Sequence, residues 1–382
     1  MASNNDDMNR CLNIADLNRR AKRRLPVPIY NFLECGADDQ YSSRHNCAAF
    51  DQLQIKARSL RDTSCVDLRT AVLGQELDWP VFLSPVGMTR MFHPDGELAA
   101  ARAAANAGTL YTASTFSSVS MEQIAAETSG PKMFQTYVLA DPVLSQEIID
   151  RAKAAGYPAM CLTVDSIVGG NREEVIRSGM SIPLKLTLKS AFQFACKPAW
   201  VSNYLRGDKW QLANFVNAKS PAGAHYGLLE PRQSWEHAQH MIEQWQGPFA
   251  IKGIMSGEDA KRAVEIGATA VIISNHGGRQ LDATPAPIEL VREVREAVGP
   301  DIDVIVDGGI RRGTHVLKAL AMGATACSVG RPYLYGLAAG GQAGIERALA
   351  LLRSELERNM VLAGCSGITD INANLLRRAG FN

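Results

Sequence analysis

A histidine and an arginine lie close together in the segment SNHGGRQ, which covers residues 274–280. The pKa of an ordinary imidazole lies near neutral pH, so His276 could accept or release a proton under working conditions. The planar guanidinium of Arg279 could bind a carboxylate through two parallel hydrogen bonds. The two side chains therefore predict acid–base chemistry on an anionic substrate, with a purely structural histidine as the alternative.

Two other segments combine glycine with arginine: DGGIRRG at residues 307–313 and GRP at residues 330–332. Glycine lets backbone N–H groups come close to a ligand, and arginine adds charge-assisted hydrogen bonds. We therefore expect these segments to bind a phosphate group. Two ordinary tight turns are the alternative.

Two more charged residues follow apolar stretches. Lys252 comes after FAI, where a fixed positive charge could lie beside an electron-rich cofactor. Asp165 comes after AMCLTV, and its carboxylate could orient an imidazole and stabilise the charged form of the ring.

The elements that must position these residues are eight short apolar segments, each followed by a helical pattern. Such nearly continuous apolar runs are typical of parallel strands that are buried on both faces. Eight repeated β/α units predict an α/β fold, a (β/α)8 barrel, with a doubly wound sheet as the alternative. The predicted strands are residues 80–87, 109–115, 132–138, 159–165, 249–254, 270–276, 303–309 and 326–331.

Polar or glycine residues stand at the end of each predicted strand. In a barrel of this kind the C-terminal strand ends meet at one rim, and that rim carries the active site. The barrel therefore brings the histidine, the lysine, the aspartate and both glycine–arginine segments to the same place.

Composition narrows the class of protein. The chain has 382 residues, of which 46% are hydrophobic and 21% charged, and its net charge is +1. This composition is globular and gives no global attraction to nucleic acid. There is no apolar run of the ~18 residues that a membrane span needs, and the N-terminus lacks an apolar signal segment. Eight cysteines without a C-x-x-C pair indicate reduced thiols and no metal site, so we expect a cytoplasmic protein.

The chain divides into an N-terminal helical segment, residues 1–79, and a barrel domain, residues 80–382. Helices are expected over residues 14–24 and over IYNFLECG. The connection between the fourth and fifth predicted strands is far longer than usual and marks an insertion at about 177–235.

The insertion is strongly basic between residues 177 and 219. This part holds seven basic residues and a single acidic one, with six aromatic residues among them. Two helical pieces are expected, residues 188–196 and 198–205. A soluble lid over the site, a segment on an anionic membrane surface and a subunit contact all fit this composition. The basic residues are Arg177, Lys185, Lys189, Lys197, Arg206, Lys209 and Lys219, and the aromatic residues are Phe192, Phe194, Trp200, Tyr204, Trp210 and Phe215.

The string SNHGGRQLD, with KGI before it and DGGIRRGTHVLKALAMGA after it, resembles the FMN-dependent α-hydroxy acid dehydrogenase/oxidase family. That family includes glycolate oxidase, L-lactate dehydrogenase, lactate oxidase and mandelate dehydrogenase. The resemblance begins at RRLPVPIYNFLECGADD, passes HPDGE, QTYV, TVD and NRE, and covers nearly the whole chain. It implies a barrel that holds FMN, with the FMN phosphate at the loops after the seventh and eighth strands.

The resemblance also implies roles for individual residues. His276 corresponds to the catalytic histidine that takes the proton of the substrate hydroxyl, and Asp165 to its carboxylate partner. Arg279 and Arg172 correspond to arginines near the substrate carboxylate, and Tyr137 to a tyrosine near the substrate hydroxyl.

Lys252 corresponds to the lysine beside N1 and O2 of the flavin, where its charge stabilises reduced flavin. The other residues expected to contact FMN surround the ring, the ribityl chain and the phosphate. They are Pro85, Val86, Gly87, Ser114, Gln135, Thr163, Ser274, Asp307, Gly308, Gly309, Arg311, Gly330 and Arg331.

Two positions depart from the family pattern. The tyrosine whose hydroxyl binds the substrate carboxylate corresponds by its spacing to Phe32, although Tyr30 lies two residues earlier. Its absence would remove one hydrogen bond and would favour a larger or more apolar substrate. Gly87 stands where several oxidases have alanine, and we expect it to leave more room beside the flavin.

These features predict the oxidation of an L-2-hydroxy acid, lactate-like or bulkier, to the 2-oxo acid. Electrons would pass from FMN to a quinone or another carrier; oxygen as the acceptor, with hydrogen peroxide as product, remains an alternative. An FMN-binding protein that has lost turnover is the alternative from another class. The resemblance implies a homotetramer, and the basic insertion allows peripheral contact with the inner membrane face.

Overall fold

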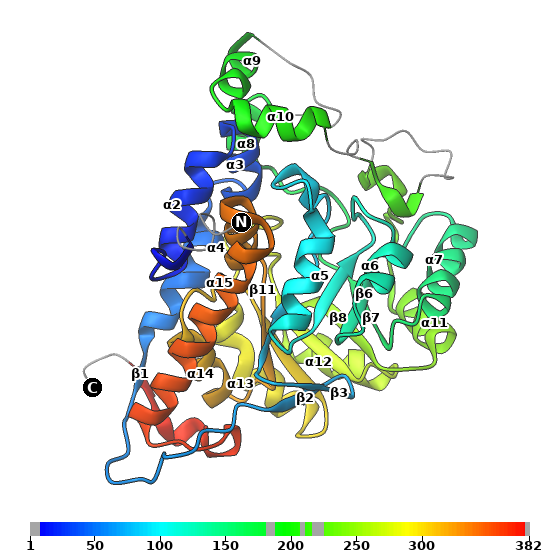
Figure 1. Cartoon of the computed structure of the whole chain (residues 1–382). Coiled ribbons are helices and arrows are strands. Elements are labelled where there is room, and N and C mark those ends of the chain that lie inside the picture. Colours follow the sequence, from blue (N-terminus) through cyan, green and yellow to red (C-terminus); the bar gives the residue numbers. More distant parts are fainter. Residues whose placement is uncertain (1–7, 181–187, 207–210, 216–224, 379–382) are drawn as a thin grey trace.

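Eight parallel strands close into a barrel in the computed structural model, which describes residues 8–180, 188–206, 211–215 and 225–378 (Figure 1). The expected (β/α)8 barrel is thereby confirmed, and each strand lies inside its predicted segment. The strands pair in the order β10-β11-β4-β5-β6-β7-β8-β9, and β9 pairs with β10 to close the ring. They are β4 (Val81–Leu83), β5 (Tyr111–Ser114), β6 (Lys132–Thr136), β7 (Ala159–Thr163), β8 (Phe249–Ile254), β9 (Ala270–Ser274), β10 (Asp303–Asp307) and β11 (Ala326–Val329).

The barrel interior has an apolar lower half and a polar upper half. A cluster of buried residues that includes Phe82, Met133 and Ile305 fills the lower half. The antiparallel hairpin of β2 (Thr70–Val72) and β3 (Gln75–Leu77) packs against this cluster and closes the N-terminal end of the barrel (Figure 1). The polar side chains of the strands are thus gathered at the opposite rim.

Helices surround the barrel as a (β/α)8 fold requires. The last of them, α15, is bent at Gly340 and Gly341, whose backbone angles are not helical. The helices are α5 (Gly96–Asn106), α6 (Met121–Glu127), α7 (Pro142–Ala154), α11 (Trp235–Trp245), α12 (Gly257–Glu265), α13 (Pro287–Val298), α14 (Gly313–Ala321) and α15 (Arg331–Ala363), with the 3-10 turn η2 (Thr89–Met91) before α5.

The N-terminal segment contains α2 (Ile14–Arg24), α3 (Val27–Glu34) and α4 (Tyr41–Ala48), so the two helices expected there are present. The side chain of Asn13 caps α2, and three basic residues in its last turn match the negative end of the helix dipole. The segment also holds strands that the sequence did not predict: β2, β3 and β1 (Leu53–Ile55), which pairs with β12 (Leu376–Arg378). Helix α2 packs on α15.

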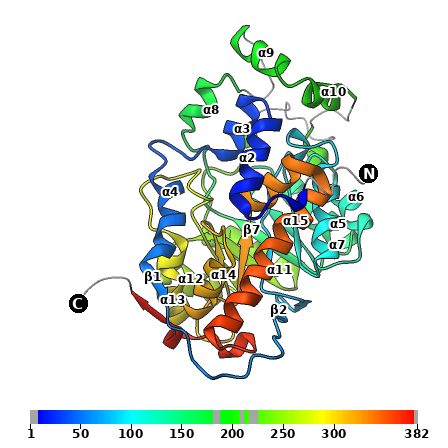
Figure 2. The same cartoon turned by 60° about the vertical axis from the view of Figure 1, so that its left-hand side comes forward.

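Helix α8 (Glu173–Arg177) leads into the insertion, which forms α9 (Leu188–Ala195), α10 (Pro198–Arg206) and the turns η3 (Ala213–Phe215) and η4 (His225–Leu228). Both expected helical pieces are confirmed. Helices α9 and α10 stand above α3 and α8 at the rim side of the barrel (Figures 1 and 2). Lys185, Lys209, Trp210 and Lys219 lie outside the described residues.

Candidate active site

His276 lies directly after β9 in a turn whose backbone is left-handed over three residues. The φ angle is 57° at His276, 65° at Gly277 and 73° at Gly278. A left-handed histidine is uncommon, and such strain concentrates at functional sites. Two hydrogen bonds hold the turn: His276 N–H donates to Ser274 Oγ (3.0 Å), and Gly278 N–H donates to Asn275 Oδ1 (3.1 Å).

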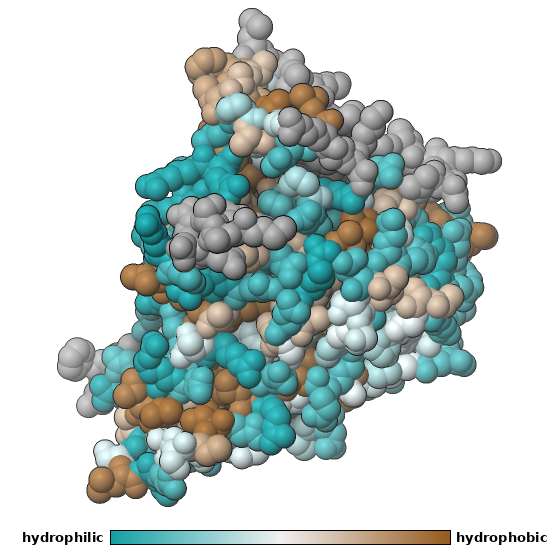
Figure 3. All heavy atoms as spheres, in the orientation of Figure 1, coloured by the Kyte–Doolittle hydropathy of each residue, from teal (hydrophilic) through white to brown (hydrophobic). Residues whose placement is uncertain are grey.

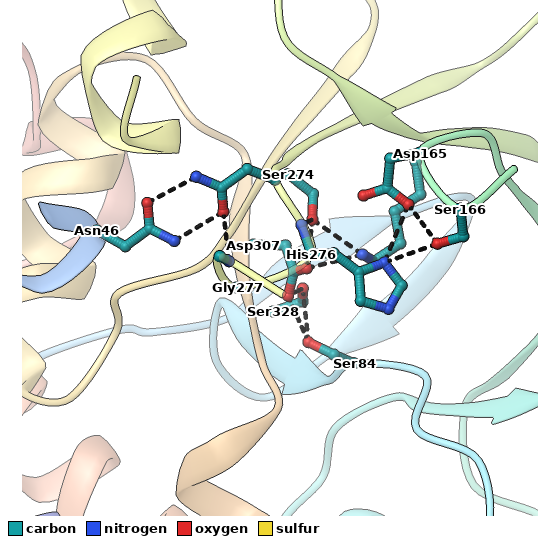
Figure 4. A network of polar contacts seen from close by, with 12 residues as sticks. Asn46, Ser84, Asp165, Ser166, Ser274, His276, Gly277, Asp307 and Ser328 are labelled. Atoms are coloured by element: carbon teal, nitrogen blue, oxygen red, sulfur yellow. Dashed lines mark hydrogen bonds and ion pairs between the residues drawn. The ribbon is translucent and has the colours of Figure 1, made fainter. Parts of the chain in front are cut away.

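The turn directs His276 toward Asp165, which follows β7 (Figure 4). The Nδ1 atom of His276 lies 3.0 Å from Asp165 Oδ1. Burial alone would raise the pKa of the Asp165 carboxyl, but the charge of His276 and its hydrogen bond outweigh burial and lower that pKa. With Nδ1 bound to a carboxylate, Nε2 is the ring nitrogen that can exchange a proton with a ligand.

Arg279 and Arg172 both lie over the ring of Phe32. Their guanidinium carbons are 5.5 and 5.8 Å from the ring centre. Arg279 also donates to the carbonyl oxygen of Leu33 (3.2 Å), so α3 fixes its position. The hydroxyl of Tyr30 donates to Asn18 Oδ1 (2.9 Å) on α2, and Tyr30 does not take the place of the missing tyrosine.

Lys252 and Asp307 form a buried ion pair at the top of the barrel. Lys252 Nζ lies 2.9 Å from Asp307 Oδ2, and their side chains are 4% and 10% exposed. Burial opposes both charges, but mutual attraction raises the pKa of Lys252 and lowers the pKa of Asp307. Hydroxyls from three other strands or their ends complete the network (Figure 4): Ser84 at 2.6 Å, Ser328 at 2.7 Å and Ser274 at 2.8 Å from the Asp307 carboxylate.

The two glycine–arginine segments meet at the start of α15. Arg331 is its first residue and donates to the carbonyl oxygens of Gly277 (2.8 Å) and Glu34 (3.0 Å). Gly308 and Gly309 have φ angles of 134° and 78°, and the ring of His315 packs behind them with Nδ1 3.2 Å from Gly309 O. A helix N-terminus beside arginines is well suited to a phosphate.

Three buried polar atoms of the expected site residues lack a protein partner. Within the described residues these are Arg331 Nε, Thr163 Oγ1 and Asp165 Oδ2. Of the three residues, Arg331 lines the cavity described below, and buried donors are almost always paired, so its Nε atom points to a ligand. Arg331 lies where the resemblance expects the FMN phosphate, and the residues present therefore fit FMN. Among the described residues there is no cluster of side chains that could hold a metal ion.

One cavity of about 440 Å³ joins most of the expected site residues. Gln135, Thr163, Asp165 and Ser274 do not line it but lie behind the residues that do. The expected residues that line it are Phe32, Pro85, Val86, Gly87, Ser114, Tyr137, Arg172, Lys252, His276, Arg279, Asp307, Gly308, Gly309, Arg311, Gly330 and Arg331.

The expectation that Gly87 leaves room beside the flavin is wrong. A Cβ atom on Gly87 would lie 2.6 Å from the carbonyl oxygen and 2.8 Å from Cβ of Phe116. The space is thus occupied by the chain after β5, and a Cβ atom here would need Phe116 to shift. The ring of Phe116 in turn stacks on Tyr137, with 4.9 Å between ring centres.

Gln280 ends the segment SNHGGRQ, and no role was predicted for it from the sequence. Its Nε2 donates to the carbonyl oxygens of Asp165 (3.2 Å) and Val168 (2.8 Å), and its Oε1 accepts from Gly170 N–H (3.1 Å). A Cβ on Gly170 would lie 2.2 Å from the carbonyl oxygen of Arg279. Gln280 thus fixes the loop that carries Asp165 against the loop that carries His276.

Ser166 and Asn46 were also missed. The hydroxyl of Ser166 donates to Asp165 Oδ1 (3.0 Å) and lies 3.2 Å from His276 Nδ1. Asn46 on α4 exchanges two hydrogen bonds with Asn275, of 2.7 and 2.8 Å. The position of Ser166 beside Asp165 could have suggested its role, whereas Asn46 lies too far away in sequence for any local signal.

Comparison with protein families gives a match to the model described as FMN-dependent dehydrogenase over residues 21–378. Glycolate oxidase 3 of Arabidopsis thaliana is 38% identical over 360 residues, which cover 94% of each chain. The (S)-mandelate dehydrogenase of Pseudomonas putida is 36% identical over 373 residues, covering 96% of this chain and 94% of the relative.

Solved structures agree with these matches. A structure described as monotopic membrane protein (S)-mandelate dehydrogenase superposes with a TM-score of 0.93 at 34% identity, covering 96% of this chain and 99% of the other. Mandelate oxidase with (S)-2-phenylpropionate gives a TM-score of 0.82 at 38% identity, covering 96% and 98%. The resemblance inferred from the sequence is thereby confirmed.

Replacing Gln280 by leucine tests its role in aligning the two loops. We expect the rate of anaerobic flavin reduction by substrate to fall roughly tenfold or more, because three hydrogen bonds are lost, while FMN remains bound. The pH dependence of this rate should also change, because Asp165 would no longer be held against the imidazolium. Stopped-flow absorbance across a pH series measures both. Gln239→Leu, on exposed α11, is the control; an unchanged rate and pH profile in Gln280→Leu would contradict the alignment role.

The ion pair predicts a pH-dependent stability difference between the native protein and Asp307→Asn. The pKa of the Asp307 carboxyl is lower in the folded protein than its value of ~3.9 in the unfolded chain. The ionised carboxylate therefore stabilises the fold fully above that unfolded pKa, and this stabilisation is lost as the pH falls toward the folded pKa. At neutral pH the variant should be less stable by about 3 kcal/mol or more, and the difference should shrink below about pH 5. Thermal melts at several pH values measure it. Asp301→Asn on the surface should show no such trend, and a difference that stays constant to pH 3 in Asp307→Asn would refute the prediction.

Proposed function

This chain belongs to the FMN-dependent dehydrogenase family, and we propose that it oxidises an L-2-hydroxy acid with a bulky apolar substituent to the 2-oxo acid. Its cofactor is FMN, and it is an enzyme of FMN-dependent 2-hydroxy acid oxidation. The observation that carries the proposal is the pairing of His276 with Asp165 (3.0 Å) beside two arginines in one cavity.

In the proposed reaction the carboxylate of the substrate binds to Arg279 and Arg172. Nε2 of His276 then takes the proton of the hydroxyl group, and Asp165 stabilises the imidazolium that forms. When bound, FMN would supply the acceptor for the α-hydrogen together with the electron pair of the broken C–H bond. Tyr137 lies at the same wall and would hydrogen-bond the hydroxyl oxygen, so the substrate is held at both ends.

The cofactor residues are proposed from the same geometry. The buried cation of Lys252 would offset negative charge on the reduced flavin, and the Arg311 and Arg331 guanidinium groups would bind the phosphate. Ser114 would contact the polar edge of the ring, whereas Gln135, which accepts a hydrogen bond from Ser114 Oγ (3.1 Å), and Thr163 do not line the cavity and would support this edge from behind. The orphaned Arg331 Nε atom supports the phosphate assignment.

The walls of the cavity favour a bulky substituent on the substrate. Besides charged groups, serines and Tyr137, the lining contains many apolar residues, and Phe32 beside the arginines stands where the resemblance expects a tyrosine hydroxyl that binds carboxylate. A small substrate such as lactate would leave apolar surface uncovered, whereas an aromatic or long aliphatic group would cover it. The apolar lining residues include Phe32, Met88, Phe92, Phe116, Val175, Ile176, Met180 and Leu229.

We propose a quinone or another carrier as the electron acceptor, with oxygen as the alternative. Support comes from the TM-score of 0.93 with the monotopic membrane protein (S)-mandelate dehydrogenase; a soluble mutant of that enzyme gives 0.83 and a mandelate oxidase 0.82, so the score follows the membrane-bound form and not the acceptor alone. The 38% identity to a glycolate oxidase keeps the oxidase alternative open. A homotetramer stays a prediction.

The α9–α10 hairpin is proposed to contact an anionic membrane surface. Phe192 and Leu205 are 72% and 75% exposed, whereas Phe194 and Phe215 are buried, so only part of the aromatic set can face a membrane. Trp200 and Tyr204 stack on each other with 5.5 Å between ring centres and so stiffen the hairpin. Among the described residues no helix is long and apolar enough to cross a membrane, and any contact of these helices is peripheral.

Anaerobic bleaching of the bound flavin tests the substrate assignment. We expect (S)-mandelate and long-chain L-2-hydroxy acids to bleach the enzyme with at least about tenfold higher efficiency than L-lactate, because each buried methylene contributes about 0.8 kcal/mol. Phe32→Tyr should raise the efficiency for lactate roughly tenfold by restoring a hydrogen bond to the carboxylate. Tyr30→Phe, whose hydroxyl lies outside the cavity, is the matched control. Equal bleaching by lactate and mandelate, with no effect of Phe32→Tyr, would refute the size preference.

Reoxidation of the substrate-reduced enzyme tests the acceptor. We expect a soluble quinone analogue to restore the flavin absorbance at least about a hundredfold faster than dissolved oxygen does. An enzyme that uses a dedicated carrier binds that carrier and lets it reach the reduced flavin, so the carrier reacts faster than oxygen. Stopped-flow absorbance and an oxygen electrode give the two rates. Rapid oxygen consumption with stoichiometric peroxide would instead establish the oxidase alternative.

A further inference from the structure

A second cavity, of about 280 Å³, lies where the C-terminal end of α2 meets the residues after η2 and the first turn of α10. We call it the basic pocket, after the Arg23, Arg24, His93 and Lys197 side chains in its wall, which also includes Trp200. Phe92 lines both this pocket and the substrate cavity, so a single side chain separates the two. The basic pocket is therefore a place distinct from the FMN site.

The cations in the wall are held in place by backbone carbonyls. Lys197 Nζ donates to the carbonyl oxygen of Arg23 (2.6 Å), and the Arg24 guanidinium donates to the carbonyl oxygen of Ala339 at the bend of α15. An ammonium has three donors and a guanidinium five, so these contacts leave N–H groups on both side chains for a ligand. The pocket is thus preorganised for a group that accepts several hydrogen bonds.

The positive charges of the basic pocket are not balanced from within it. None of the described residues that line it is acidic. Burial and the like charges of Arg24 and Arg23 lower the pKa of Arg20, because several guanidinium groups are crowded at this end of α2. Burial also lowers the pKa of the His93 ring, whose Nδ1 faces Asp95 Oδ2 at 3.5 Å. An anion would relieve this repulsion.

Apolar side chains stand on the same hairpin that forms one wall of the pocket. Phe192 on α9 and Leu205 on α10 are exposed, and Figure 3 shows hydrophobic residues gathered at this end of the molecule. A phosphate in the pocket and acyl chains along these residues would satisfy both features at once. Neither an isolated phosphate nor an apolar ligand would do so.

We propose that the basic pocket binds the phosphate group of an anionic phospholipid, an inference that rests on the proposed membrane contact of the α9–α10 hairpin. Arg23, Arg24 and Lys197 donate to the phosphate oxygens, and the acyl chains lie along the exposed side of the hairpin. The pocket thereby gives the membrane contact a specific headgroup site.

Cys196 offers a direct probe because it is exposed and lines the basic pocket. In the FMN-loaded enzyme we would measure alkylation of Cys196 by N-ethylmaleimide with mass spectrometry, using the exposed Cys65 as an internal reference. Dihexanoyl phosphatidylglycerol, below its micelle concentration, should slow alkylation of Cys196 at least about fivefold and leave Cys65 unchanged. Dihexanoyl phosphatidylcholine and inorganic phosphate are the comparison probes.

Variants assign the effect to the pocket. Arg24→Gln and Arg23→Gln should each weaken protection by phosphatidylglycerol roughly tenfold, because each removes a charge-assisted hydrogen bond. Lys22→Gln, a matched loss of charge on the same helix where Lys22 lies over Tyr30 and not in the pocket, should change nothing. For each variant, protection is the ratio of the Cys196 alkylation rates without and with lipid. The ratio is needed because the loss of a nearby charge changes the reactivity of the thiol even without lipid.

The outcomes separate this inference from the membrane contact. If enzyme co-floats with phosphatidylglycerol vesicles but no phosphate compound protects Cys196, the membrane contact stands and the pocket is refuted. If inorganic phosphate protects as well as the lipid and no vesicle binds, the pocket is an anion site for a soluble phosphate, and the lipid assignment is refuted. Protection by phosphatidylglycerol alone, lost in Arg24→Gln, supports the proposal.

Discussion

The buried ion pair between Lys252 and Asp307 is the constraint on which the upper half of the barrel depends. Removing two charges from water costs several kcal/mol each, and the cost is offset only when geometry and extra hydrogen bonds are good. Here Lys252 Nζ also donates to Ser274 Oγ (2.9 Å), and Ser84 and Ser328 donate to the carboxylate. These side chains come from β8, β9, β10, β11 and the end of β4, so satisfying one pair ties five neighbouring strands together. The same arrangement leaves a fixed cation at the floor of the FMN cavity.

Close backbone approach is the second constraint, and it explains why glycines gather around the catalytic pair. A Cβ on Gly278 would lie 2.3 Å from the backbone nitrogen of Ser43, and a Cβ on Gly36 would lie 2.7 Å from Gly278 O. Together with Gly170, these contacts interlock the loops after α3, β7 and β9. The N-terminal segment is therefore part of the active site: it supplies Phe32, over whose ring both arginines lie, and Ser43 packs against the histidine turn at Gly278.

The fold was predictable because its signal is local and repeated. Apolar strand segments and helical patterns alternate eight times, and each polar strand end is visible without knowledge of distant residues. His276, Asp165 and Lys252 follow from the same logic, since parallel strands must deliver their ends to one rim. Gln280, Ser166 and Asn46 were not assigned, because their roles depend on which loops touch after folding. The prediction that Gly87 leaves room beside the flavin was wrong for the same reason, because the chain after β5 fills the space that a side chain would occupy.

The consecutive helices α2 and α3 reach the basic pocket and the substrate cavity, respectively. Helix α2 ends in Arg23 and Arg24 at the basic pocket, and α3 carries Phe32 into the substrate cavity. Trp200 Nε1 donates to the carbonyl oxygen of Met91 (2.9 Å), next to Phe92, the residue shared by both cavities. The α9–α10 hairpin therefore makes a direct hydrogen bond to the segment whose next residue, Phe92, forms part of the wall of the substrate cavity.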